Sequence, residues 1–273
     1  MKTSPESNSQ TSVARRRLIG ISIAGLAVLL IIIAIVTLKT PIGNKELPKL
    51  VIRVDDIQDF AFREAQLFLL NESIVNQVPL SLAVIVGMFG EDAEIVQTLK
   101  LAVSSGSEVA VHGWKHEDLA KLSFGEQVAL LSRSRSQIKE ILDYDVEVLV
   151  PPMFSFDENT LAAMNEEGYN IISTLTDYAE PGFMSNVISL PATIELSDFS
   201  NGIWSMKSLD SIKAEISKSV KKFGYTVIVT HPQEFVADGT LNPDRIELYR
   251  TLLITLKEDY SFETLESLGE NWR

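Results

Sequence analysis

Three histidines and a pair of adjacent aspartates are the residues of this chain whose types and spacing suit chemistry. His112 and His116 lie in the sequence HGWKH, and a spacing of four residues places both imidazoles on one face of a helix. Two such imidazoles suit the ligation of one divalent metal ion. Gly113 stands where a thermolysin-type protease has glutamate, so that class of enzyme is excluded. Two surface histidines on a helix would show the same spacing, so the pair alone does not decide.

The other polar residues of interest close two apolar runs. Asp55 and Asp56 end the run VIRVDD, and His231 ends the run TVIVTH. Two carboxylates at a strand end are costly for stability alone, which favours a functional role. The alternatives are a helix cap for the aspartates and a structural hydrogen bond for the histidine.

An alternation of strands and helices must position these residues. Apolar runs typical of parallel strands covered on both faces occur at 50–54, 80–86, 108–111, 146–150, 170–174, 187–190 and 226–230. Helical patterns occur at 62–71, 91–104, 125–142, 158–167, 209–222 and 244–257. Repeated strand–helix units predict an α/β domain, either a parallel barrel or a doubly wound sheet. The polar residues then follow the carboxyl ends of strands, where barrel enzymes build their sites.

Composition narrows the function further. The formal net charge of −13 repels phosphate backbones, so we expect no nucleic-acid partner. Cysteine is absent, which excludes a disulfide scaffold, thiol catalysis, iron–sulfur clusters and cysteine-based zinc sites.

Residues 18–38 form an uncharged apolar stretch of 21 residues, long enough to cross a membrane as a helix. A cleaved signal peptide is the alternative, but its apolar region would span only ~7–15 residues. Three arginines precede the stretch, so the positive-inside rule places the N-terminus in the cytoplasm. We therefore predict a cytoplasmic basic tail (1–17), a single-pass transmembrane anchor (18–38), a linker (39–49) and an extracytoplasmic catalytic domain (50–273).

Four motifs, in order along the chain, resemble those of the polysaccharide deacetylases. They are VDD at the end of the first strand, HGWKH, the strand end containing Pro151 and Pro152, and the apolar strand that closes on His231. This family comprises the NodB-homology enzymes of the carbohydrate esterase family 4 type. The resemblance implies a distorted (β/α) barrel of NodB type and metal-dependent hydrolysis of the carbon–nitrogen bond of an acetamide on an N-acetylated sugar.

The resemblance also implies a role for each matching residue. Asp55 matches the general base and His231 the general acid. Asp56, His112 and His116 match the ligands of a divalent ion, for which zinc is the first expectation and cobalt, manganese and nickel are alternatives.

Three further residues are predicted to lie on the substrate side. A backbone N–H near Met153 matches the oxyanion donor of the family. Phe154 stands one position after the usual aromatic residue of the third motif. Trp114, inside HGWKH, either stacks on a sugar ring or packs the loop.

The sequence also departs from the family pattern at the start of the third motif. The third motif normally begins with an arginine that contacts the base, and the residues before Pro151 are apolar here. Arg53 lies two residues before Asp55, on the same side of an ideal strand, and is our candidate for that contact. No motif assigns the carboxylate that orients the acid histidine, and Asp177 is our candidate.

The leading hypothesis is a membrane-anchored, metal-dependent deacetylase acting on an N-acetylated glycan. A first alternative is a carbohydrate-binding pseudoenzyme that kept the barrel and lost turnover. A second alternative is a metal-dependent hydrolase of a non-sugar carbon–nitrogen amide bond.

Overall fold

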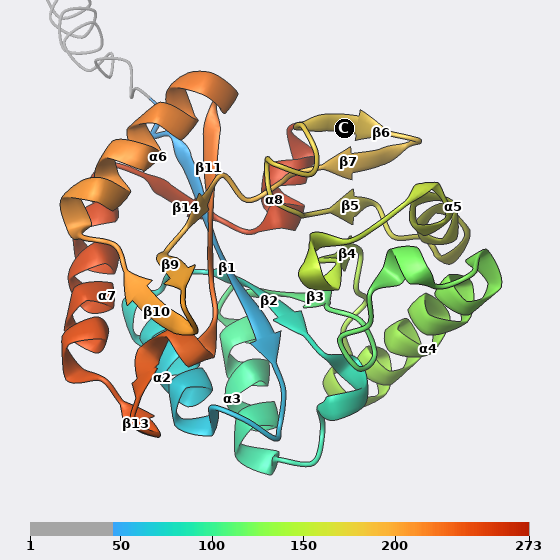
Figure 1. The fold of residues 1–273 in the computed structure, drawn as a ribbon, viewed down its shortest axis with the longest axis horizontal. Helices are drawn as coiled ribbons and strands as arrows, with labels where there is room; N and C mark the ends of the chain where they lie inside the picture. The colour runs from blue at the N-terminus through green and yellow to red at the C-terminus, as the bar shows by residue number, and fades with distance from the viewer. Residues whose placement is uncertain (1–45, 273) are drawn as a thin grey trace, which may run out of the picture. The chain divides into compact units, whose positions relative to one another are not determined.

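The computed structural model describes residues 46–272, and these form a curled α/β fold around one large sheet (Figure 1). The sheet runs in the order β6-β7-β5-β4-β3-β2-β1-β11-β8, and β14 also pairs with β1. All pairs are parallel except β6 with β7. The order has two ends, so the sheet is an open, curled half-barrel. The prediction of an α/β fold is confirmed, with the barrel open at one side.

The strands of this sheet are short, and most match the predicted apolar runs. They are β1 (Lys49–Ile57), β2 (Leu80–Val84), β3 (Glu108–Val111), β4 (Val148–Leu149), β5 (Ile171–Ile172), β6 (Gly182–Met184), β7 (Val187–Ser189), β8 (Ile194–Glu195), β11 (Tyr225–Thr230) and β14 (Ser261–Glu263). Strands β6, β8 and β14 were not predicted, because each has only two or three residues and, unlike β4, β5 and β7, none lies within a longer apolar run.

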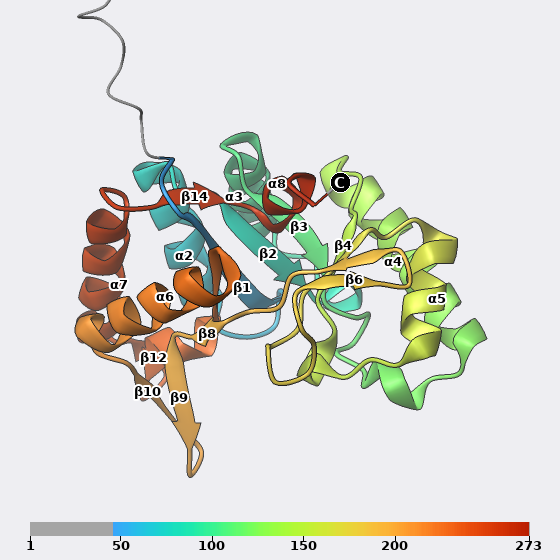
Figure 2. The ribbon, with the colours of Figure 1, turned by 90° about the horizontal axis from the view of Figure 1, so that it is seen from above.

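All helices but the last pack around the outer side of the sheet (Figures 1 and 2), and the last packs on the inner side through Leu265 and Leu268. They are α2 (Arg63–Asn76), α3 (Ala93–Ser104), α4 (Phe124–Leu142), α5 (Glu158–Glu167), α6 (Leu209–Phe223), α7 (Pro243–Leu256) and the short α8 (Leu265–Glu270). Short 3-10 turns follow four strands: η1 (Val86–Met88), η2 (Leu119–Lys121), η3 (Pro152–Phe154) and η4 (Pro232–Phe235). Six of the helices match the predicted patterns to within a few residues.

Alternation along β1 sorts its side chains between two apolar cores. Leu50, Ile52 and Val54 pack into the larger core, to which apolar side chains of the helices also contribute. Val51 belongs to the second, smaller core inside the curled sheet. Because strand side chains alternate, Arg53 and Asp55 share the inner face with Val51. Both are at most 1 % exposed, so two charged groups stand in the middle of the half-barrel.

A small hairpin projects from the domain on the side of β8 (Figure 2). Its antiparallel strands are β9 (Ser197–Ser200) and β10 (Ile203–Met206), joined by Asn201 and Gly202. These two residues have φ of 51° and 77°, as the mirror-image type I′ turn of tight hairpins requires. A second hairpin, β12 (Val236–Ala237) with β13 (Thr240–Leu241), follows η4.

Among residues 46–272, no helix is long and apolar enough to cross a membrane. The predicted anchor at 18–38 lies outside the described residues, as do the basic tail and most of the linker. These expectations therefore stay predictions.

Candidate active site

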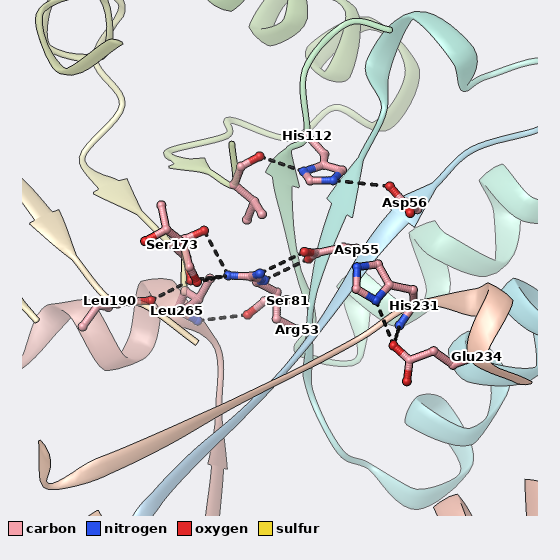
Figure 3. Close-up of polar contacts among 12 residues, drawn as sticks. Arg53, Asp55, Asp56, Ser81, His112, Ser173, Leu190, His231, Glu234 and Leu265 are labelled. Carbon is pink, nitrogen blue, oxygen red and sulfur yellow. Dashed lines mark hydrogen bonds and ion pairs between the residues drawn. The ribbon is translucent and has the colours of Figure 1, made fainter. Parts of the chain in front are cut away.

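Adjacent aspartates at the end of β1 reach the same site because the strand is irregular there. The pairing of β1 with β2 shifts register between Val54 and Ile57, and Asp56 has a left-handed backbone with φ of 63°. In a regular strand, neighbouring side chains point to opposite faces. The irregularity turns Asp56 toward His112 while Asp55 stays on the inner face with Arg53 (Figure 3). Helix α2 begins after Phe62, so neither aspartate is its N-terminal cap.

The loop after β3 brings both histidines of HGWKH to Asp56. The Oδ1 atom of Asp56 lies 3.3 Å from His112 Nε2 and 3.4 Å from His116 Nε2. A tetrahedral ion with bonds of about 2.05 Å separates its ligands by about 3.3 Å, which matches these two distances. All three ligand atoms lie within 4.8 Å of one another. The segment is not a helix; His116 instead has a left-handed backbone with φ of 64°.

The hydrogen bonding of His112 favours a cation at this position. His112 Nδ1 lies 2.8 Å from the carbonyl oxygen of Val150, which can only accept, so Nδ1 carries the proton. A neutral His112 therefore turns the lone pair of Nε2 toward a carboxylate oxygen of Asp56. A cation between the two groups removes that repulsion, and the carbonyl contact is the outer support typical of metal-bound histidines.

The ionisation of the cluster also suits metal binding. Burial raises the pKa of Asp56, but the hydrogen bond and charge of His112 in its protonated form, with the charge of His231, outweigh it and hold this pKa well below its usual range. A cation bound in place of the His112 Nε2 proton would act on Asp56 in the same direction. Burial and the charge of His112 lower the pKa of His116. At neutral pH the site thus offers a carboxylate and a neutral imidazole, which are the states that bind metal.

Arg53 holds Asp55 through a buried, two-pronged ion pair (Figure 3). Its Nε donates to Asp55 Oδ1 at 2.8 Å and its Nη2 donates to Asp55 Oδ2 at 2.9 Å. Its Nη1 donates to the carbonyl and hydroxyl oxygens of Ser173 and to the Thr174 carbonyl, at 2.8 to 3.0 Å. The guanidinium thus spans the half-barrel from β1 to β5. The structure gives Arg53 the contact with Asp55 that the sequence predicted.

The carboxylate beside His231 is Glu234, and the prediction of Asp177 in that place was wrong. Glu234 Oε1 lies 2.8 Å from His231 Nδ1 and accepts the His231 backbone N–H at 2.9 Å. Glu234 is 1 % exposed. Asp177 instead lines a pocket with Glu195 and Lys207. Sequence reasoning missed Glu234 because it sought the partner on another strand, whereas the turn η4 folds it back onto the histidine three residues earlier.

Burial lowers the pKa of His231, but the hydrogen bond with Glu234 outweighs burial, and the charge of Asp55 adds to the effect. The pKa therefore lies above the usual value for histidine. A larger share of His231 is protonated at neutral pH than in a free imidazole, as a proton donor requires.

Two aromatic side chains lie next to His231. The Trp204 ring lies 5.4 Å from the His231 ring at an angle of 35°, and the Phe199 ring lies 4.6 Å from Trp204. Both belong to the β9–β10 hairpin, which was not predicted from the sequence. The Asn201-Gly202 pair between two strand-like segments was the signal that could have found it.

The three residues predicted to lie on the substrate side have different environments. Met153 is half-exposed in the turn η3 with φ of 54°, and the Phe154 ring pairs with Tyr178 at 5.7 Å. Trp114 packs on Gly87 and lies 4.3 Å under the Arg133 guanidinium, which favours the packing alternative for this tryptophan.

One family model matches the central part of the chain. The family model described as "Polysaccharide deacetylase" matches residues 61–172. Over these residues the chain is similar to the polysaccharide deacetylase family. The match spans HGWKH and the Pro151-Pro152 strand end, two of the four motifs on which the resemblance rested. No curated protein matches the chain.

Solved structures of the same fold come from several bacteria. A protein from Mycobacterium smegmatis, provisionally named a polysaccharide deacetylase, has a TM-score of 0.65 at 17 % identity, covering 84 % of this chain and 92 % of that one. A family 4 acetyl xylan esterase from Clostridium thermocellum, solved with a cobalt ion, has a TM-score of 0.55 at 16 % identity, with 82 % and 91 % covered. A pseudoenzyme of the same family from Bacillus anthracis has a TM-score of 0.52 at 15 % identity, with 82 % and 66 % covered. At these identities the similarity concerns the fold.

Proposed function

We propose that this protein is a polysaccharide deacetylase, a metal-dependent hydrolase that removes acetyl groups from an N-acetylated glycan. The observation that carries the proposal is one constellation at the carboxyl end of the sheet. The cluster Asp56–His112–His116 can hold a divalent ion, with Asp55 and His231 beside it. A divalent ion bound there would supply Lewis acidity to polarise the acetamide carbonyl and activate water. Zinc is the first candidate because one carboxylate and two imidazoles are ligands it prefers.

The residues around the cluster supply the proton transfers. Asp55 is fixed by Arg53 and takes the proton of the attacking water as general base. His231, kept protonated by Glu234, donates a proton to the nitrogen of the departing amine. A backbone N–H near Met153 would stabilise the negative charge on the carbonyl oxygen.

The contact of Arg53 with Asp55 argues against the binding-only alternative. The third-motif arginine is absent from this sequence, and that absence favours a pseudoenzyme. Arg53 is fully buried and holds both oxygens of Asp55, so the base has its cationic partner from a different strand position.

Acetate release from chito-oligosaccharides tests the proposal. We expect release by the full-length protein supplied with Zn²⁺ or Co²⁺, loss of release with chelator, and recovery on metal addition. Binding of the oligosaccharide without acetate release would establish the pseudoenzyme alternative. Faster hydrolysis of simple acetamides than of the sugar substrate would establish the non-sugar amidase.

The pH dependence of kcat/KM tests the role of His231. Because the pKa of His231 is raised by Glu234, the basic limb of the profile should lie above the usual pKa of histidine. Glu234→Gln removes the charge and should move that limb to lower pH while leaving the metal content unchanged. A basic limb that does not move in Glu234→Gln would show that another group is the acid.

We also propose that the domain is anchored outside the cytoplasm by the apolar segment 18–38. The support is the length of that segment and the arginines before it. The full-length protein should stay with membranes through a high-salt wash, since salt screens charge and does not weaken apolar insertion. A mature chain in the soluble fraction that begins after Leu38 would show cleavage and contradict the anchor.

A further inference from the structure

The two carboxylate oxygens of Asp56 have different neighbours. Oδ1 faces the Nε2 atoms of His112 and His116 at 3.3 and 3.4 Å. Oδ2 instead accepts a hydrogen bond of 2.9 Å from Nε2 of Gln233. One oxygen is therefore directed to the metal position, and the other is occupied by an amide of the protein.

The backbone of Asp56 needs such support. Its φ of 63° is a left-handed conformation that L-residues adopt at a cost in free energy. Strained residues of this kind persist when the surrounding structure fixes them. The hydrogen bond from the Gln233 side chain joins η4 to the irregular end of β1. It holds the Asp56 carboxylate in the orientation that faces the histidines.

Gln233 is placed on a rigid turn. It lies between Pro232, whose ring restricts the backbone, and Glu234, which accepts hydroxyl hydrogen bonds from Ser197 at 2.6 Å and Thr230 at 3.0 Å. The next residue, Phe235, is fully buried. His231 begins the same turn, so one short segment carries both the acid histidine and the amide that holds Asp56.

The chemistry of the glutamine argues against a packing role. Its Oε1 atom is buried without a hydrogen-bond partner among the described residues. An unsatisfied buried acceptor costs free energy, which a leucine of similar size would avoid. The hydrogen bond from Nε2 to Asp56 offsets this cost. If the amide were rotated by 180°, Oε1 would face a carboxylate oxygen of Asp56 and repel it.

We propose that Gln233 is a positioning residue for the metal site. It restricts Asp56 to binding through Oδ1 alone and fixes the metal position relative to His231. This inference rests on the proposed function, because it presupposes that the cluster Asp56–His112–His116 holds a divalent ion. Groups that support metal ligands in this way typically contribute 10–100-fold to metal affinity.

The test is Zn²⁺ affinity of the full-length protein by competition with a chromophoric chelator, comparing wild type with Gln233→Leu. We expect Gln233→Leu to bind Zn²⁺ about 10–100-fold more weakly. The matched control is Gln58→Leu, a half-buried glutamine near the end of β1 whose side chain makes no hydrogen bond among the described residues. This control should keep wild-type affinity.

A spectroscopic measurement separates positioning from general destabilisation. In the Co²⁺-loaded protein, the visible absorption of the ion reports its coordination, and Gln233→Leu should change that spectrum while Gln58→Leu does not. If Gln233→Leu does not fold, Gln233→Asn keeps the amide on a side chain one methylene shorter and should show the same loss of affinity.

The outcomes distinguish this inference from the proposed function. If the wild-type protein binds neither Zn²⁺ nor Co²⁺, the proposed metal-dependent function is wrong. If the wild type binds the ion and the Gln233 variants match it in affinity and in Co²⁺ spectrum, Gln233 does not position Asp56 and the inference is overturned.

Discussion

Asp55→Asn should lower kcat by about 10²–10⁴-fold and leave the metal content of the protein near that of the wild type. Among the described contacts, Asp55 pairs with Arg53, whereas Asp56 contacts His112 and His116. Metal binding should therefore depend on Asp56 and not on Asp55. The substitution removes a proton acceptor and keeps the shape of the side chain. The measurement is acetate release at saturating glycan, with metal content determined on the same preparation.

Two comparisons make this result decisive. Asp56→Asn should lower metal affinity, because the amide is a poorer ligand than the carboxylate. If Asp55→Asn loses its metal and regains its rate when metal is supplied in excess, then Asp55 is the metal ligand and Asp56 the base. Circular dichroism of both variants checks that the loss of activity occurs in folded protein.

Arg53→Met should destabilise the domain by about 3–5 kcal/mol, because it leaves Asp55 buried without its countercharge. The variant also loses the hydrogen bonds from Arg53 to the carbonyl oxygens of Ser173 and Thr174 on the opposite part of the sheet. Methionine has a similar length, so the change tests charge and hydrogen bonding more than volume. The free energy of unfolding in urea at neutral pH is the quantity to measure.

The double variant Arg53→Met/Asp55→Leu is the control for the buried pair. Removing both charges replaces an ion pair with apolar groups, which is often close to neutral for stability. The double variant should therefore recover much of the stability lost in Arg53→Met, while remaining inactive. If Arg53→Met alone costs less than about 1 kcal/mol, the pair behaves like an exposed ion pair and the account of a desolvated charge is wrong.

Part of the site could be predicted because strand alternation and motif spacing are local. Arg53 and Asp55 are two residues apart, and the period of a strand places them on one face. The same rule fails for Asp55 and Asp56, which are neighbours and should point apart. Their common site depends on the register shift in β1 and the left-handed backbone of Asp56, and neither follows from the order of residue types.

The remaining features depend on contacts between distant segments. Glu234 and Gln233 act through a 3-10 turn that folds back on β11 and reaches across to β1. Trp204 comes to His231 on a hairpin whose short strands carry no clear hydrophobic period. Asp177 follows β5, which was the reason to expect it beside His231. It instead lines a pocket with Glu195, and Glu234 is the carboxylate at His231.

The metal content of the purified full-length protein tests the central claim most directly. Native mass spectrometry after equilibration with Zn²⁺ and removal of free ion should find one zinc per chain in the wild type. The double variant His112→Ala/His116→Ala should carry none, because a single carboxylate remains of the three ligands. Zinc retained by the double variant, or absent from the wild type, would contradict the account.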